Sequence, residues 1–380
     1  MAEKLGGMPS VTPEQLDGVT PLFDEPHPLP EGVSLGGRSL SQRAYDIGES
    51  VISGAIGGLR EFGHELMHGD YSDKFRNEFK QRYRFETSDG VQMTARILNP
   101  EYLDSDNPEA DDKAIVYSYS LLVPACHGVE LPTVAALAAH GEETGRSVIV
   151  ITTESHSGPM TKDQLNSLSD VWNMPRRRFE VLRQIFPGGK KIMVTGASLG
   201  GTMSHAMART WQKEAQESGV EIEVTHDFAV ASAGHFEYSP KHYPRLLRQI
   251  FREGKGGIDY LKDGEGWKGK AQRGFEFIGT MPIYPSQLFA VRAISMGLKN
   301  APLRDVHDNI PYDIDVRDLT FSEDELVHSR RRLHMAVSSK HPNSTHEQRP
   351  GPHVALLTTG KDWTLRQFDS VTSKRMPAAA

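Results

Sequence analysis

The first regular pattern along the chain is a pair of alternating hydrophobic and polar runs at residues 83–100, YRFETSDGVQMTARILNP. Alternation with a period of two places every second side chain on the same face of a strand. Asp89 and Gly90 separate the two runs, and this dipeptide favours the tight turn of a β-hairpin. The segment therefore predicts two antiparallel strands at the start of a folded unit.

Further along, short apolar runs of strand length are separated by segments with helical periodicity. The run RSVIVITTE is continuously apolar at its centre, as in a strand covered on both faces. Strands that alternate with helices predict an α/β fold, with a mostly parallel sheet and helices on both faces. The expected strands are 113–123, 146–154, 190–195, 226–234, 312–322 and 333–339, and the expected helices are 133–145, 163–186 with a break near Pro175, 201–219 and 353–371.

Two regions depart from this rhythm and define the expected domain organisation. Residues 39–68 space their apolar side chains like an amphipathic helix, and residues 239–305 are helical in pattern, dotted with glycine and rich in aromatic residues and cations. The expected parts are a flexible leader at 1–38, an N-terminal helical segment at 39–80, a core at 81–238 and 312–371 interrupted by a helical cap insertion at 239–311, and a tail at 372–380.

Composition and charge exclude several classes of protein. The net charge of −7 over 380 residues gives no general attraction to nucleic acid. The one cysteine, Cys126, excludes an internal disulfide framework and a multi-cysteine metal site. No apolar run reaches the roughly 18 residues of a membrane span, and the N-terminus lacks a signal-peptide core. We therefore expect a soluble, cytoplasmic protein without a nucleic-acid partner or a stable membrane span.

The stretch HELMH at residues 64–68 matches the zinc motif H-E-x-x-H, in which two histidines one turn apart bind the metal. Such a site needs a third ligand, and the extension found in one large class of these enzymes is absent because Gly69, Asp70 and Tyr71 follow. Glu78 stays open as a downstream ligand. Since the motif precedes the whole α/β pattern, we interpret it as the polar face of a surface helix and expect no metal.

The stretch VTGASLGGT contains G-x-S-x-G between an apolar strand and an amphipathic helix, which is the context of a serine nucleophile on a tight turn. Ser198 would occupy a strained backbone position that exposes its hydroxyl at the sheet edge. Gly196 and Gly200 would avoid collisions across the turn, and Gly201 would let helix and strand pack closely. The N–H of Leu199 would point to where an oxyanion forms.

These features resemble the α/β-hydrolase superfamily over roughly residues 82–368. The resemblance rests on the following features, in chain order: the 83–100 hairpin, the ESHSG loop at 154–158, the GASLGG turn, a helical insertion after the sixth strand and two further strands. The resemblance implies an α/β-hydrolase fold and a nucleophile, acid and histidine base in that order along the chain. It also implies that the insertion folds over the nucleophile as a cap.

The resemblance places the acid after the seventh strand and the base after the eighth. Asp324, in the turn after Phe321 and Ser322, is the favoured acid. His353, which opens the last helix 29 residues later, is the favoured base. Each role also has alternative candidates. For the acid these are Asp318, Glu323, Glu325 and Glu237, and for the base they are His346 in the loop and His341 next to the strand.

The oxyanion hole needs a second N–H from the loop after the third strand. The family often has His-Gly there, and His127–Gly128 is present, but this pair lies well beyond the expected strand end. Ser120 or Leu121 therefore joins Leu199 as the expected donors. Cys126 nearby is interpreted as a packed thiol.

The predicted function is a serine hydrolase that cleaves a carboxylic ester or related acyl bond through an acyl-enzyme, with no cofactor and no metal. The alternatives are acyl transfer or peptide cleavage on the same fold, or a non-catalytic interaction protein with a broken triad. Residues 239–305 carry a net charge of +6 and several aromatic residues. We therefore expect a small-molecule acyl ester as the substrate. A neutral ester and an anionic or lipid-like ester both stay open.

Overall fold

The computed structural model describes the predicted core, namely residues 71–81, 83–89, 92–104, 106–119, 131–153, 173–232, 266–267, 270, 306, 309–324 and 341–372. The predicted leader, most of the N-terminal helical segment, nearly all of the cap insertion and the tail from residue 373 lie outside these residues. The domain boundaries at these regions therefore stay predictions.

The described elements follow the predicted alternation of strands and helices. The strands are β1 (Tyr83–Glu86), β2 (Gln92–Leu98), β3 (Lys113–Ser118), β4 (Val148–Thr153), β5 (Lys190–Ala197), β6 (Ile222–Val230), β7 (Asp315–Phe321) and β8 (Ser344–Arg349). The α-helices are α2 (Asp73–Lys80), α3 (Leu131–Thr144), α5 (Met174–Ile185), α6 (Leu199–Ser218) and α12 (Thr359–Thr372), and the 3₁₀ helices are η3 (Pro100–Tyr102) and η7 (His353–Leu357).

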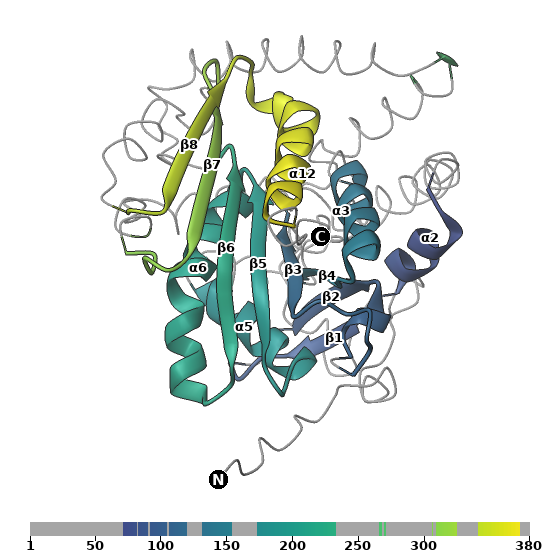
Figure 1. Cartoon of the computed structure of the whole chain (residues 1–380), viewed down its shortest axis with the longest axis vertical. Coiled ribbons are helices and arrows are strands. Elements are labelled where there is room, and N and C mark those ends of the chain that lie inside the picture. The colour runs from purple at the N-terminus through teal and green to yellow at the C-terminus, as the bar shows by residue number, and fades with distance from the viewer. Residues whose placement is uncertain are drawn as a thin grey trace, which may run out of the picture.

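The eight strands form one sheet in the order β1-β2-β4-β3-β5-β6-β7-β8 (Figure 1). β2 runs antiparallel to both β1 and β4, and all other neighbouring strands are parallel. The sheet is open, mostly parallel and crossed by helical connections, which is the arrangement of the α/β-hydrolase fold. The expected fold class and the resemblance to that superfamily are thus confirmed at the level of the fold.

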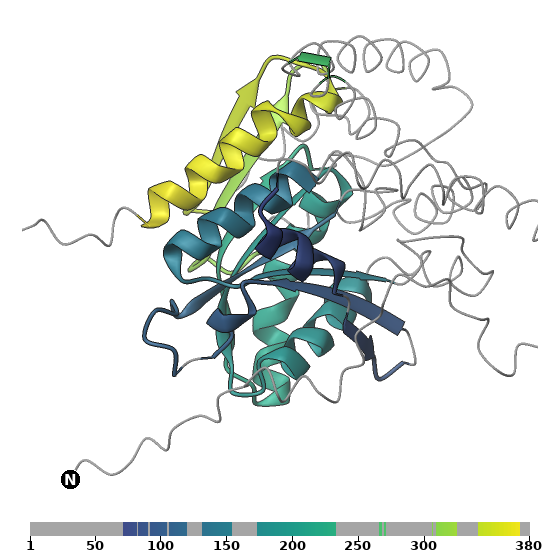
Figure 2. The same ribbon diagram turned by 90° about the vertical axis from the view of Figure 1, so that its right-hand side faces the viewer.

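Helices cover both faces of the sheet, as Figures 1 and 2 show. One core joins α5 and α6 to the sheet and includes the fully buried Trp211, whose indole N–H donates to the Pro175 carbonyl at 2.7 Å. The opposite core joins α2, α3 and α12 to the sheet. Burial on both faces explains why β3, with every side chain buried, reads as a nearly continuous apolar run. No helix within the described ranges is long and apolar enough to cross a membrane.

The expectation for the eighth strand is wrong. The strand that pairs with β7 is β8, residues 344–349, and not the segment 333–339, which lies outside the described residues. β8 has the sequence STHEQR and is the edge of the sheet, with most of its side chains partly or fully exposed. An edge strand needs no apolar stripe, so hydrophobic patterning favoured the more apolar LHMAVSS instead. His346 consequently lies in a strand rather than in a loop.

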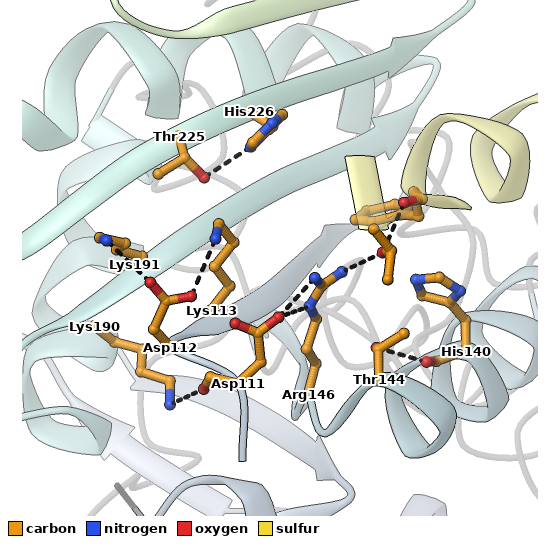
Figure 3. A network of polar contacts seen from close by, with 12 residues as sticks. Asp111, Asp112, Lys113, His140, Thr144, Arg146, Lys190, Lys191, Thr225 and His226 are labelled. Atoms are coloured by element: carbon orange, nitrogen blue, oxygen red, sulfur yellow. Dashed lines mark hydrogen bonds and ion pairs between the residues drawn. The ribbon is translucent and has the colours of Figure 1, made fainter. Parts of the chain in front are cut away.

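A buried ion pair lies at the amino ends of the central strands of the sheet (Figure 3). Arg146, in the turn between α3 and β4, is 1% exposed. Its Nε and Nη2 atoms lie 2.7 Å and 2.6 Å from Asp111 Oδ2, and its Nη1 donates to Thr372 Oγ1 at 3.2 Å. The guanidinium therefore connects the loop before β3 to the end of α12, and holds the last helix against the sheet.

Replacing Arg146 with methionine is expected to lower the free energy of unfolding by about 3 kcal/mol, because it removes the guanidinium from a buried carboxylate. Urea denaturation followed by circular dichroism measures the loss. Lys191→Met is the matched control, since Lys191 pairs with Asp112 across 2.9 Å while both side chains are over 40% exposed. Its expected cost is about 0.5 kcal/mol or less. Equal losses in the two variants would contradict burial as the reason.

Candidate active site

Ser198 lies on a strained turn between β5 and α6. Its backbone has φ 55° and ψ −121°, a conformation that non-glycine residues rarely adopt and that costs on the order of 1–3 kcal/mol. The surrounding chain holds it there, since Ser198 N–H donates to the Val230 carbonyl at 2.8 Å and its own carbonyl accepts from the Thr202 N–H at 3.2 Å. The turn thus links Ser198 to β6 as well as to its own helix.

The glycines around Ser198 are required by close backbone contacts. A Cβ atom on Gly196 would lie 2.5 Å from the Gly200 carbonyl carbon, and one on Gly200 would lie 2.0 Å from the Ser118 carbonyl oxygen. A Cβ atom on Gly201 would approach the Val230 carbonyl oxygen to 3.1 Å. A side chain cannot fit at the first two positions unless the backbone moves. The steric requirement for glycine that the sequence predicts at Gly196 and Gly200 is therefore present. The turn packs directly against the end of β3.

His353 is the histidine that contacts Ser198. It opens η7 directly after β8, and its Nε2 atom lies 3.0 Å from Ser198 Oγ. Its Nδ1 atom lies 2.6 Å from Asp324 Oδ2, and both His353 and Asp324 are buried. With the proton on Nδ1, the imidazole donates to the carboxylate and accepts from the serine hydroxyl. This tautomer is the one that can remove the serine proton.

Backbone hydrogen bonds hold the Asp324 turn beside the segment that carries His353. The turn follows β7, and the Asp324 N–H donates to the Phe321 carbonyl at 3.1 Å. Ser322 N–H donates to the Arg349 carbonyl, and Glu323 N–H donates to the Gly351 carbonyl. The register of β7 and β8 is therefore extended into both loops, and it sets the distance between carboxylate and imidazole.

The other described candidates for acid and base have contacts with other residues. His346, in β8, faces Thr320 at 3.2 Å and Asp318 at 3.5 Å. Asp318 is buried within β7, where it also accepts a hydrogen bond from Ser232 at 3.1 Å. His341 contacts the Pro311 carbonyl at 2.9 Å, and Glu323 is an exposed turn residue. Glu325 and Glu237 lie outside the described residues.

The oxyanion-hole candidates are described only in part. Leu199 is the first residue of α6, so its N–H belongs to the group that has no acceptor within the helix. Ser120 and Leu121 follow directly on the last described residue of the β3 loop, Tyr119, and lie outside the described residues, as do Cys126 and His127–Gly128.

The zinc alternative rests on residues 64–68, which lie outside the described part of the chain. Its proposed third ligand, Glu78, is described and has a structural contact. Its carboxylate accepts the Asn99 N–H at 2.8 Å, and burial raises the pKa of this group. Within the ranges that the structure describes, no cluster of three histidine, cysteine or acidic side chains could hold a metal ion.

One residue near the turn was missed by the sequence interpretation. Arg178 lies in α5 and donates to the Ser118 hydroxyl at 2.6 Å. The signal was present, because Arg178 occupies the same helical stripe as the buried Val181, Leu182 and Ile185. An arginine within an RRR run is ordinarily assigned to solvent, and here the helix turns it into the core.

Comparisons with known proteins find similarity in structure alone. No protein-family model and no curated protein matches the sequence. The enol-lactonase from Burkholderia xenovorans LB400 superimposes with a TM-score of 0.49 and 14% identity over 74% of this chain and 97% of that one.

Two esterases give similar values. A thermophilic esterase from Thermogutta terrifontis has a TM-score of 0.47 and 15% identity over 78% of this chain and 100% of that one. An esterase from Pyrococcus furiosus has a TM-score of 0.47 and 13% identity over 80% and 94%. Similarity at this level does not identify the substrate of an enzyme. The fold assignment above rests on the strand order, and the description of the site rests on the contacts among its own residues.

Proposed function

We propose that this chain, which has the α/β-hydrolase fold, is a serine hydrolase that cleaves a carboxylic ester or related acyl bond. The observation that carries the proposal is the pair of contacts made by His353, to Ser198 at 3.0 Å and to Asp324 at 2.6 Å. The strained backbone of Ser198 supports it further, because strain of this kind persists where a side chain must be presented in one direction.

In the proposed reaction, His353 Nε2 takes the proton of Ser198 while the serine oxygen bonds to the acyl carbon. The electron pair of the carbonyl moves onto its oxygen, where the Leu199 N–H and a second donor from Ser120 or Leu121 stabilise the charge. The intermediate collapses to an acyl-enzyme as the alcohol leaves with the proton from His353. Water then repeats the sequence, and the acid product and free Ser198 result. Asp324 keeps the imidazole oriented throughout.

The proposed substrate is a small-molecule acyl ester, and the reaction requires neither a metal nor a cofactor. The cationic, aromatic-rich composition of residues 239–305 supports an anionic or lipid-like acyl compound. The proposed location is the cytoplasm, which the single cysteine supports.

Labelling with a fluorophosphonate probe tests the proposal. The purified protein is expected to gain one phosphonyl adduct, mapped by peptide mass spectrometry to Ser198, because only an activated serine attacks such a probe at an appreciable rate. Ser218→Ala is the matched control and should label normally, since the Ser218 hydroxyl donates only to the Glu214 and Ala215 carbonyls of its own helix. EDTA should leave the labelling rate unchanged.

Each opposite result identifies an alternative. A folded protein that gains no adduct would favour the non-catalytic interaction protein. Turnover that EDTA abolishes would favour the metal site at residues 64–68. Transfer of the acyl group to an added alcohol in preference to water would favour the acyltransferase.

A further inference from the structure

Arg178 is a buried cation on the inner face of α5. Its side chain is 6% exposed, and its Nη1 atom donates to Ser118 Oγ at 2.6 Å and approaches Met207 Sδ to 3.8 Å. Ser118 is itself fully buried as the last residue of β3, and Met207 lies in α6. The guanidinium therefore lies in the core between α5, α6 and the central strands.

Its environment differs from that of two other buried arginines, Arg146 and Arg177. Arg177 pairs with Asp89 at 2.7 Å and Arg146 pairs with Asp111 at 2.6 Å, whereas no carboxylate of the described residues lies within ion-pair distance of Arg178. Among the described residues, the buried Arg178 Nε atom has no hydrogen-bond partner. Burial lowers the pKa of Arg178 to about 10, so the side chain keeps its charge at neutral pH. A buried charge without a counter-ion destabilises a protein, which makes Arg178 a candidate for a functional role.

The contacts of Ser118 lead from this cation to the Ser198 turn. Ser118 pairs with Gly196 across β3 and β5, and its carbonyl oxygen is where a Cβ on Gly200 would collide at 2.0 Å. The chain that follows Ser118 runs through Tyr119 to Ser120 and Leu121, the proposed second donors of the oxyanion hole. The residue that Arg178 contacts thus packs with its backbone against Gly196 and Gly200 of the Ser198 turn.

We propose that Arg178 is a positioning residue that fixes Ser118 at the oxyanion side of the turn and stabilises, through its positive charge, the negative charge that develops on the substrate oxygen. The inference rests on the proposed function. Between unit charges on the order of 10 Å apart in a protein interior, the attraction is large enough to change a rate about tenfold. Because the charge is fixed before substrate binds, it favours the transition state over the neutral ground state.

The test compares three substitutions at Arg178 with one control. Arg178→Met and Arg178→Gln remove the charge, and the glutamine amide can still donate to Ser118, whereas Arg178→Lys keeps the charge. Arg183→Met is the control, because it removes one positive charge from the exposed side of the same helix. Steady-state hydrolysis of p-nitrophenyl acetate gives kcat and KM, and urea denaturation gives the unfolding midpoint.

The expected result is a fall in kcat of about tenfold or more in both neutral variants, with KM within about twofold of the wild type. Their unfolding midpoints should stay level or rise, because an uncompensated buried charge has been removed. Arg178→Lys should recover most of kcat, and Arg183→Met should match the wild type.

Two outcomes would overturn the inference while the proposed function stands, provided that the wild type labels at Ser198. One is a kcat within about twofold of the wild type in both neutral variants. The other is a loss of kcat that follows a lowered unfolding midpoint and that lysine does not reverse, which would make Arg178 a structural residue. An unlabelled wild type would instead overturn the proposed function.

Discussion

Replacing Ser198 with alanine is expected to lower kcat for p-nitrophenyl acetate by about 10⁴-fold or more, because no other group can form the acyl-enzyme. Stability should change little, since the change removes one oxygen atom and the Ser198 N–H keeps its bond to the Val230 carbonyl. Circular dichroism and urea denaturation check that the variant is folded, and steady-state kinetics give the loss.

Ser198→Gly separates chemistry from strain in the same assay. It should be equally inactive, but its unfolding free energy should rise by about 1 kcal/mol, because glycine adopts φ 55° without a Cβ penalty. Ser218→Ala serves as the active control. Turnover by Ser198→Ala near that of the wild type would contradict the proposed function altogether.

The second large effect is expected at His353, where alanine should lower kcat by about 10³- to 10⁵-fold. Asp324→Asn should lower kcat by a similar factor, because the amide would favour the wrong imidazole tautomer for accepting the Ser198 proton. His346→Ala and His341→Ala are the matched histidine controls. Their imidazoles contact Asp318 and the Pro311 carbonyl, so these changes should alter stability more than kcat.

The order of these four losses is the measurement that decides. An inactive but folded His346→Ala variant, together with an active His353→Ala variant, would contradict the assignment of the base. A steep loss of kcat in Asp318→Asn, together with an active Asp324→Asn variant, would likewise identify Asp318 in β7 as the acid.

The sequence allowed the central sheet and the nucleophile turn to be predicted, because both impose strong local constraints. Buried parallel strands such as β3 and β4 require apolar side chains on two faces, so their pattern is visible without any structure. The turn at Ser198 requires glycine at two positions for steric reasons, and these glycines appear as a motif. The position of the turn at Ser198 could therefore be predicted from the sequence alone.

The remaining features depend on contacts between distant segments, which leave a weaker local pattern. β8 is held by its backbone hydrogen bonds to β7 and is mostly exposed, so its composition carries no apolar signal. The choice between His341, His346 and His353 depends on where β8 ends, and this is set by its register with β7. Arg178 was overlooked because its charge favours solvent, while the helix that carries it faces the core.

The β7–β8 register has a consequence for how the protein becomes active during synthesis. Ser198 and the strands around it come from the first part of the chain, but the imidazole that it needs follows 155 residues later. A ribosome-bound chain that ends before β7 can bury much of its core and form the turn, since domains begin to fold from the N-terminus. Such a chain carries Ser198 without the imidazole that we propose as its base. The proposed reaction therefore starts only after the segment that carries η7 and α12 has left the ribosome and docked on the sheet.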